Sequence, residues 1–164
     1  MMLRVLLLFF FVSSSSFATT WTVDDDGKAD FNNIQEAVDA ASDGDEIVVM
    51  PGTYTSTQDG HVINMIGKAI WLHSSDGAGV TIVDGENIRR GIVCVNGETS
   101  KTVIEGFTFR NGYSTSYGAG MELDYASPTI ENCVVMNCKL DGGNSSYGAG
   151  IYLDTSNATF TNCE

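Results

Sequence analysis

Three acidic residues, Glu122, Asp124 and Asp154, form the best candidate site in the sequence. Successive side chains of a β-strand point to opposite faces, so Met121 and Leu123 would face a core while Glu122 and Asp124 point outward. Asp154 repeats the position of Asp124 thirty residues later, and stacked strands would place the two carboxylates about 4.8 Å apart. Like charges at this distance repel each other. A hard cation such as Ca²⁺, bound by the carboxylate oxygens, would relieve the repulsion.

A pair of solvated carboxylates is the alternative interpretation. Solvent and salt screen exposed charges, and Asp is also common in turns. Tyr152 replaces Glu122 in the later copy, which reduces the set of ligands. A lyase that removes a proton next to a uronate carboxylate would also need a basic residue, and Lys139 is the only one after Arg110. Both interpretations stay open, and no catalytic residue is assigned.

A sequence repeat is the element that would position these carboxylates. Ser116–Cys133 and Ser146–Cys163 are identical at ten of eighteen aligned positions. Each copy holds two apolar stretches that are too short for helices, and a fixed period of this kind is typical of stacked repeats. An antiparallel sandwich would need hairpin turns, of which the sequence shows few. We therefore predict an all-β fold: a right-handed, single-stranded parallel β-helix (a solenoid) of about four coils, with the hand taken from the general crossover rule.

The period predicts three strands in each coil. First strands would begin near Val62, Ile92, Met121 and Ile151, second strands would centre on Ile70, Ile104, Ile130 and Phe160, and third strands on Ile82, Thr108 and Val134. The next third strand would fall beyond Glu164, where the sequence stops. We therefore expect residues 47–164 to form the coils, truncated at the C-terminus, with an exposed last rung that continues into further sequence.

The first 46 residues predict that the protein is exported and that a helix caps the N-terminal end of the solenoid. Residues 1–18 have the features of a secretory signal peptide, with a basic start, an apolar run and a small-residue cleavage site. Residues 19–46 would form a short strand and an N-terminal capping α-helix, with Asn32 and Gln35 as a capping box and Gly44 as a stop. We expect a secreted or cell-surface protein, with no membrane insertion after cleavage of the signal.

The net charge of the chain argues against one class of binding partner. A net charge of −13 disfavours nucleic acid, whose phosphates are bound by Lys and Arg.

Cys133 and Cys163 hold equivalent places on adjacent rungs, within reach of a disulfide. A ladder of reduced, buried cysteines is the alternative. His61 and His73 are isolated and suit coil edges, and three arginines would be solvated or paired with Asp84 and Glu86: Arg89, Arg90 and Arg110.

The segment Phe31–Tyr54 resembles the start of the β-helix in the pectin-lyase-like superfamily, which includes pectate lyases and pectin methylesterases. Ile104–Gly112 and Pro128–Cys133 resemble its coil repeats, and the paired Gly-Ala-Gly and Asn-Cys elements are similar to repeats of polymorphic outer-membrane proteins. The resemblance implies a secreted protein that binds or acts on acidic polysaccharide, with calcium among outward acidic residues on one sheet. An enzyme of this type would be a lyase acting on a pectate-like substrate. A non-catalytic cell-surface or adhesive solenoid is the alternative.

Overall fold

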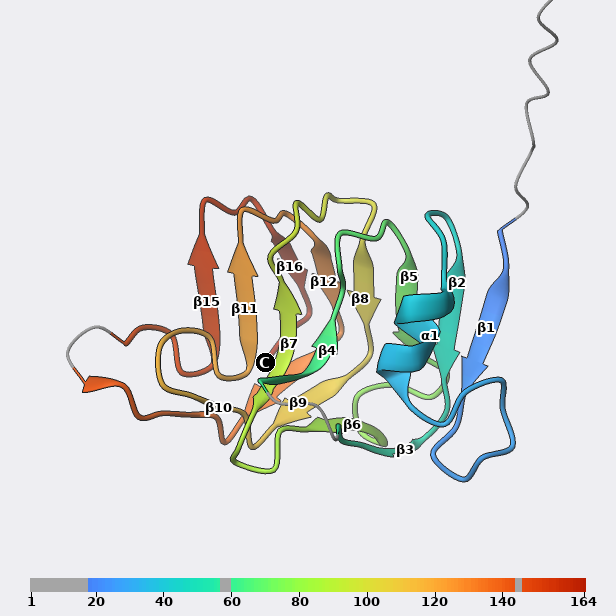
Figure 1. Ribbon diagram of the computed structural model, residues 1–164, viewed down its shortest axis with the longest axis horizontal. Coiled ribbons are helices and arrows are strands. Elements are labelled where there is room, and N and C mark those ends of the chain that lie inside the picture. Colours follow the sequence, from blue (N-terminus) through green and yellow to red (C-terminus); the bar gives the residue numbers. More distant parts are fainter. Residues whose placement is uncertain (1–17, 57–59, 144–145) are drawn as a thin grey trace, which may run out of the picture.

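The computed structural model describes residues 18–56, 60–143 and 146–164. Within these residues the chain forms one helix and many short strands, which wind into a parallel β-solenoid of about five turns (Figure 1). The predicted all-β solenoid is therefore confirmed. The predicted signal peptide lies outside the described residues, apart from Ala18. No helix among the described residues is both long and apolar enough to cross a membrane.

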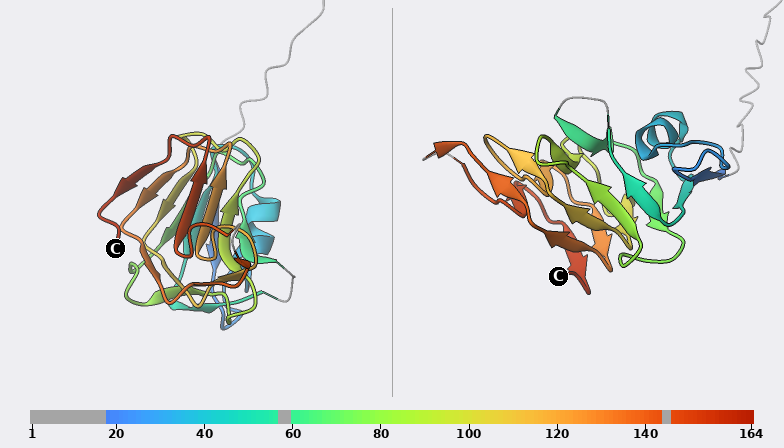
Figure 2. Two further views of the ribbon diagram at one scale, coloured as in Figure 1. Left: turned by 90° about the vertical axis from the view of Figure 1, so that its left-hand side faces the viewer. Right: turned by 90° about the horizontal axis from the view of Figure 1, so that it is seen from below.

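Three parallel sheets form the sides of the solenoid (Figure 2). The six-stranded sheet has the order β1 (Thr20–Val23), β2 (Glu46–Val49), β5 (Trp71–Ser74), β8 (Val103–Glu105), β12 (Thr129–Glu131) and β16 (Thr159–Thr161). A second sheet, the β4–β15 sheet, contains β4 (His61–Asn64), β7 (Arg90–Cys94), β11 (Met121–Asp124) and β15 (Ile151–Asp154). The third, the β3–β13 sheet, contains β3 (Gly52–Tyr54), β6 (Thr81–Asp84), β9 (Thr108–Arg110) and β13 (Val134–Met136). A small parallel pair, β10 (Tyr113–Ser114) and β14 (Lys139–Leu140), follows the third strands β9 and β13 along the chain.

The register agrees closely with the period read from the sequence. Ile104 pairs with Ile130, and Ile130 with Phe160, as predicted. The third strands also align as predicted, through Ile82, Thr108 and Val134. In two of the predicted series of strands, the earliest position was wrong by one or two residues. Leu72, not Ile70, aligns with Ile104, and Ile63, not Val62, aligns with Ile92. Strands β1, β2 and β3, which precede the clear repeat, join the same sheets and supply the additional turn.

The core fills the inside of the coil, because each short strand turns alternate apolar side chains inward. Along the six-stranded sheet the inward side chains of Ile47, Leu72, Ile104 and Ile130 are fully buried. Met121 and Leu123 are fully buried in the β4–β15 sheet, as the sequence predicted. Glu122 and Asp124 therefore point to the outside of the same strand.

The helix α1 (Ile34–Ala40) packs against β1, β2 and β4 at the N-terminal end. Asn33 is its N-cap and accepts a hydrogen bond from the backbone N–H of Glu36 at 2.8 Å, so the predicted cap at Asn32 and Gln35 was wrong by one residue. Gln35 instead uses its side-chain amide to pair with the backbone of Asn64, at 2.7 and 3.1 Å. This amide satisfies backbone groups at the open edge of β4, where a further strand would otherwise be needed.

Candidate site on the β4–β15 sheet

The two aspartates of the candidate site lie in register on adjacent strands. Asp124 on β11 pairs with Asp154 on β15, and Glu122 pairs with Tyr152. Each strand ends at its aspartate because the next residue, Tyr125 or Thr155, adopts a left-handed backbone conformation with φ of 49° or 46°. The predicted stacking of Asp154 on Asp124 is therefore confirmed.

Asp124 carries an unusual oxygen. Its Oδ1 atom is shielded from solvent and has no hydrogen-bond partner among the residues that the structure describes. Asp154 is exposed, and its Oδ1 accepts a hydrogen bond from the hydroxyl of Thr155 at 3.2 Å. Shielding a carboxylate oxygen without a donor costs free energy. A proton donor or a cation at this position would stabilise the fold.

Glu122 is engaged by Arg90, one strand away on β7. Arg90 Nε lies 2.8 Å from Glu122 Oε2, and both side chains are less than one fifth exposed. Arg90 also donates to the backbone carbonyl of Tyr117 at 3.0 Å and to Ser116 Oγ at 2.9 Å. Burial raises the pKa of Glu122; Arg90 offsets part of this rise, and the charge of Asp124 adds to it. Glu122 is thus paired with Arg90, and its role as a calcium ligand stays a prediction.

Asp124 and Asp154 are the candidate cation ligands on this face. Across residues 18–56, 60–143 and 146–164, no three His, Cys, Asp or Glu side chains are arranged to hold a metal ion. Asp124 and Asp154 fit a divalent cation in chemistry, because the shielded Oδ1 needs a positive partner and Asp154 lies one rung away. The remaining ligands would have to come from solvent or from a bound molecule.

A cluster of three tyrosines borders the aspartates and was not predicted. The ring of Tyr117 stacks on Tyr152 with centroids 4.5 Å apart, and lies parallel to Tyr147 at 6.2 Å. Burial raises the pKa of Tyr152, and the charge of Asp154 raises it further. The repeated Ser-Tyr-Gly-Ala-Gly motif was the available signal, since Tyr117 and Tyr147 hold the same place in it.

Other predicted residues lie away from the aspartates. His61, on β4, has its pKa lowered by burial and by the charge of Arg90. His73 lies on the six-stranded sheet and contacts Glu46. Two adjoining polar pockets of about 180 Å³ each lie between α1 and β4, and none of the three predicted site residues lines them.

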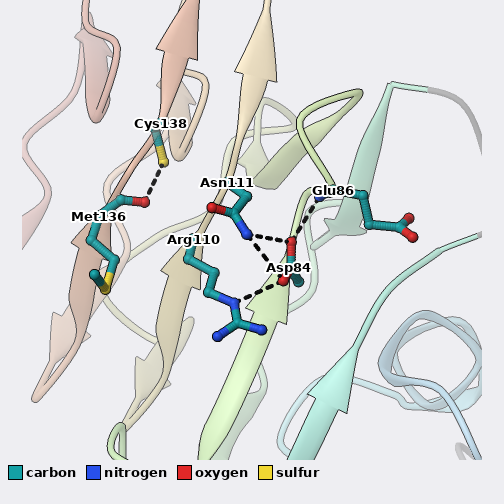
Figure 3. A network of polar contacts seen from close by, with 6 residues as sticks. All are labelled: Asp84, Glu86, Arg110, Asn111, Met136 and Cys138. Atoms are coloured by element: carbon teal, nitrogen blue, oxygen red, sulfur yellow. Dashed lines mark hydrogen bonds and ion pairs between the residues drawn. The ribbon is translucent and has the colours of Figure 1, made fainter.

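Arg110 and Arg89 have the partners that the sequence suggested, whereas Arg90 does not. Asp84 accepts hydrogen bonds from Arg110 Nε at 2.7 Å, from Asn111 Nδ2 at 3.1 and 3.2 Å, and from the N–H of Glu86 at 2.9 Å (Figure 3). Arg89 pairs with Glu86. Burial alone would raise the pKa of Asp84, but the hydrogen bonds outweigh it and hold the pKa below its usual value.

We expect Asp84→Asn to cost about 1–2 kcal/mol of unfolding free energy at pH 7, because it removes a charged acceptor that three groups share. Since folding lowers the pKa of Asp84, its contribution is complete above the unfolded pKa, about 3.9, and disappears as the pH falls through the lower folded value. Urea unfolding at pH 7 and in a series down to pH 3 measures this difference. The matched control is Asp76→Asn at an exposed turn; a cost for Asp84→Asn that does not shrink with acid would contradict the assignment.

The four cysteines are free thiols, as in the reduced alternative, but Cys133 is buried whereas Cys163 is partly exposed. Cys133 Sγ donates to the carbonyl of Glu131 at 3.2 Å, and Cys163 Sγ to that of Thr161 at 3.4 Å. Burial raises the pKa of Cys133 to about 12. At neutral pH this thiol is protonated and unreactive.

The stacked sheets and the repeated coil define the class of this protein as a parallel β-solenoid, or β-helix repeat protein. Comparison with protein-family models, with curated proteins and with solved structures found no match to the chain. The resemblance to the pectin-lyase-like superfamily therefore rests on the sequence motifs alone.

Proposed function

We propose that this chain is a secreted β-helix protein of pectate-lyase-like type that binds acidic polysaccharide through Ca²⁺ at Asp124 and Asp154. One observation carries the proposal. The shielded, unpartnered Oδ1 of Asp124 lies on the strand next to the in-register Asp154, on the outside of the coil. A cation between the two carboxylates would satisfy this oxygen and reduce their repulsion.

The acidity of the chain explains why a cation is needed. With a net charge of −13, the protein repels a polyuronate, and two carboxylates at the site strengthen this effect. Ca²⁺ takes about six to eight oxygen ligands, so two aspartates leave room for carboxylates of the polysaccharide. The ion would then bridge two negative partners. We therefore expect weak affinity for Ca²⁺ alone and higher affinity when the polysaccharide is present.

Binding without catalysis fits this face better than a lyase reaction. Proton abstraction needs a base beside the substrate, and Arg90 is held by Glu122, Tyr117 and Ser116. The repeated motifs also have structural roles: Asn162 donates to Asn132 one rung away at 3.3 Å, as part of the turn. This observation favours the second candidate, a non-catalytic cell-surface or adhesive solenoid.

Calorimetric titration with oligogalacturonate tests the proposal. We expect saturable binding with excess CaCl₂ and none with EDTA, because the ion supplies the attraction. Asp124→Asn and Asp154→Asn should each weaken binding by about tenfold or more, since each removes one ligand charge. Asp76→Asn, which makes the same change at an exposed turn, should leave the affinity unchanged.

Two results would overturn the proposal: equal binding in EDTA, or no binding in either buffer. Incubation of the calcium complex distinguishes the candidates further. Release of unsaturated uronate, detected by its ultraviolet absorbance, would show a lyase, and intact oligogalacturonate would show a binding protein.

A further inference from the structure

Two aromatic rings form a rigid pair on the outward face of the six-stranded sheet, a different side of the coil from the aspartates. Trp71 and His73 both point outward from β5, and Leu72 between them is fully buried. Their ring centroids are 4.1 Å apart with 22° between the ring planes. Trp71 is 43% exposed, which is high for the largest apolar side chain.

Carboxylates on the neighbouring rungs hold both rings in place. The indole Nε1 donates to Glu105 Oε2 on β8 at 3.2 Å. On the other side, His73 Nε2 lies 3.0 Å from Glu46 Oε1 on β2, and Glu46 Oε2 accepts from the hydroxyl of Thr20 at 2.7 Å. The hydrogen bonds from Thr20 and His73 lower the pKa of Glu46. The rings are thus fixed before any ligand arrives, which reduces the entropic cost of binding.

Trp71 stays partly exposed although His73 stacks on one face of its indole. In register beside Trp71 lie Glu46 and Val103, and beyond Val103 lies Thr129. The neighbours are therefore one acidic, one apolar and one hydroxyl side chain, and the apolar surface extends from the indole to Val103.

The exposed indole and its two carboxylate neighbours limit the kind of molecule that could bind here. A stable protein partner would need about 800 Å² of surface on each side, more than one ring provides. A polyanion would be repelled by Glu46 and Glu105. A neutral sugar has an apolar C–H face of the width of the indole, and hydroxyl groups that can donate to carboxylates. Aromatic surface with a few placed polar groups is the usual composition of small-molecule sites.

We propose that Trp71, His73, Glu46 and Glu105 form a calcium-independent binding site for neutral sugar residues of a polysaccharide. The site does not depend on Asp124 or Asp154, which lie on another sheet. A protein with both sites would hold a polysaccharide wall at two faces, one through acidic and one through neutral sugars.

Tryptophan fluorescence provides a direct test, because the chain has two tryptophans, Trp21 and Trp71. The probes are cellohexaose, xylohexaose, laminarihexaose and β-1,4-galactohexaose, each titrated in EDTA. We expect a saturable change of emission with at least one probe. Trp71→Ala should weaken binding of that probe, measured by calorimetry, by about tenfold or more. Trp21→Phe should keep both the affinity and the emission change, since Trp21 donates to Asp45 elsewhere.

Further variants distinguish this site from the calcium site and from a contact between two copies of the chain. Glu105→Gln keeps an oxygen acceptor for the indole and should weaken sugar binding several-fold without loss of thermal stability. Asp124→Asn should have no effect, so failure of the calcium site leaves this result unchanged. Absence of binding by all four probes, or equal binding by Trp71→Ala that is folded by circular dichroism, would overturn the proposal. So would a dimer, seen by light scattering, that Trp71→Ala abolishes, because a second copy would then be the occupant.

Discussion

Replacing Ile104 with alanine is expected to lower the free energy of unfolding by about 2–5 kcal/mol. Ile104 is fully buried and lies at the centre of an inward column, between Leu72 on one rung and Ile130 on the next. The substitution would leave a cavity that both neighbours line, and a packed core relaxes only partly into such a space. Urea unfolding followed by circular dichroism measures the loss.

Ile88→Ala is the matched control, because Ile88 is 62% exposed. The same chemical change at this position should alter the unfolding free energy by no more than about 0.5 kcal/mol. Similar losses for the two variants would show that the inward column does not stabilise the solenoid, and that the assigned register is wrong.

Replacing Gly120 with alanine is expected to cost about 2–3 kcal/mol through overpacking. A Cβ atom at this position would lie 2.4 Å from the carbonyl oxygen of Gly150 and 2.5 Å from Val135 Cγ1. A Cβ at Gly91, one rung earlier, would lie 2.6 Å from the carbonyl of Gly120. Gly91 and Gly120, the second glycine of the first Gly-Ala-Gly motif, thus let the chain pass close to the next rung.

Gly79→Ala is the control, because a Cβ there meets no atom within 4 Å and its φ is not positive. Its melting temperature should stay the same or rise slightly, since alanine restricts the unfolded chain. If Gly120→Ala melted at the same temperature as Gly79→Ala, the close approach of the rungs at Gly120 would be refuted.

The parts of the fold that could be predicted are those that the repeat determines. An aligned pair of copies gives the register directly, so the columns through Ile104, Ile130 and Phe160 followed from the period. Strands β1, β2 and β3 precede the recognisable repeat, and their place in the sheets became visible only in the structure. The helix cap was ambiguous, because Asn32 and Asn33 are both good capping residues with Gln35 and Glu36 three positions later.

In the candidate site, too, only the features that follow from the repeat could be predicted. Asp124 and Asp154 could be placed together because they hold equivalent positions in the two copies. The pairing of Arg90 with Glu122 could not be predicted. The residue in register with Glu122 is Val93, three positions after Arg90, and the long arginine side chain bridges this offset. The contacts that hold Trp71 and His73 could not be predicted either. Glu105 and Glu46 come from the rungs on either side, at positions that the sequence repeat does not relate to each other.

Luminescence of Tb³⁺, an analogue of Ca²⁺, tests the central claim most directly. Tyr152 precedes Asp154 by two residues on β15, and Asp154 pairs with Asp124, so Tyr152 lies on the same face of the sheet as both aspartates. An excited tyrosine transfers energy to a nearby lanthanide ion. With oligogalacturonate present, we predict terbium emission that Ca²⁺ displaces, that Asp154→Asn abolishes and that Tyr152→Phe reduces, while Asp76→Asn leaves it intact. Emission of full strength in Asp154→Asn, or no emission from the native protein, would contradict a cation site at Asp124 and Asp154.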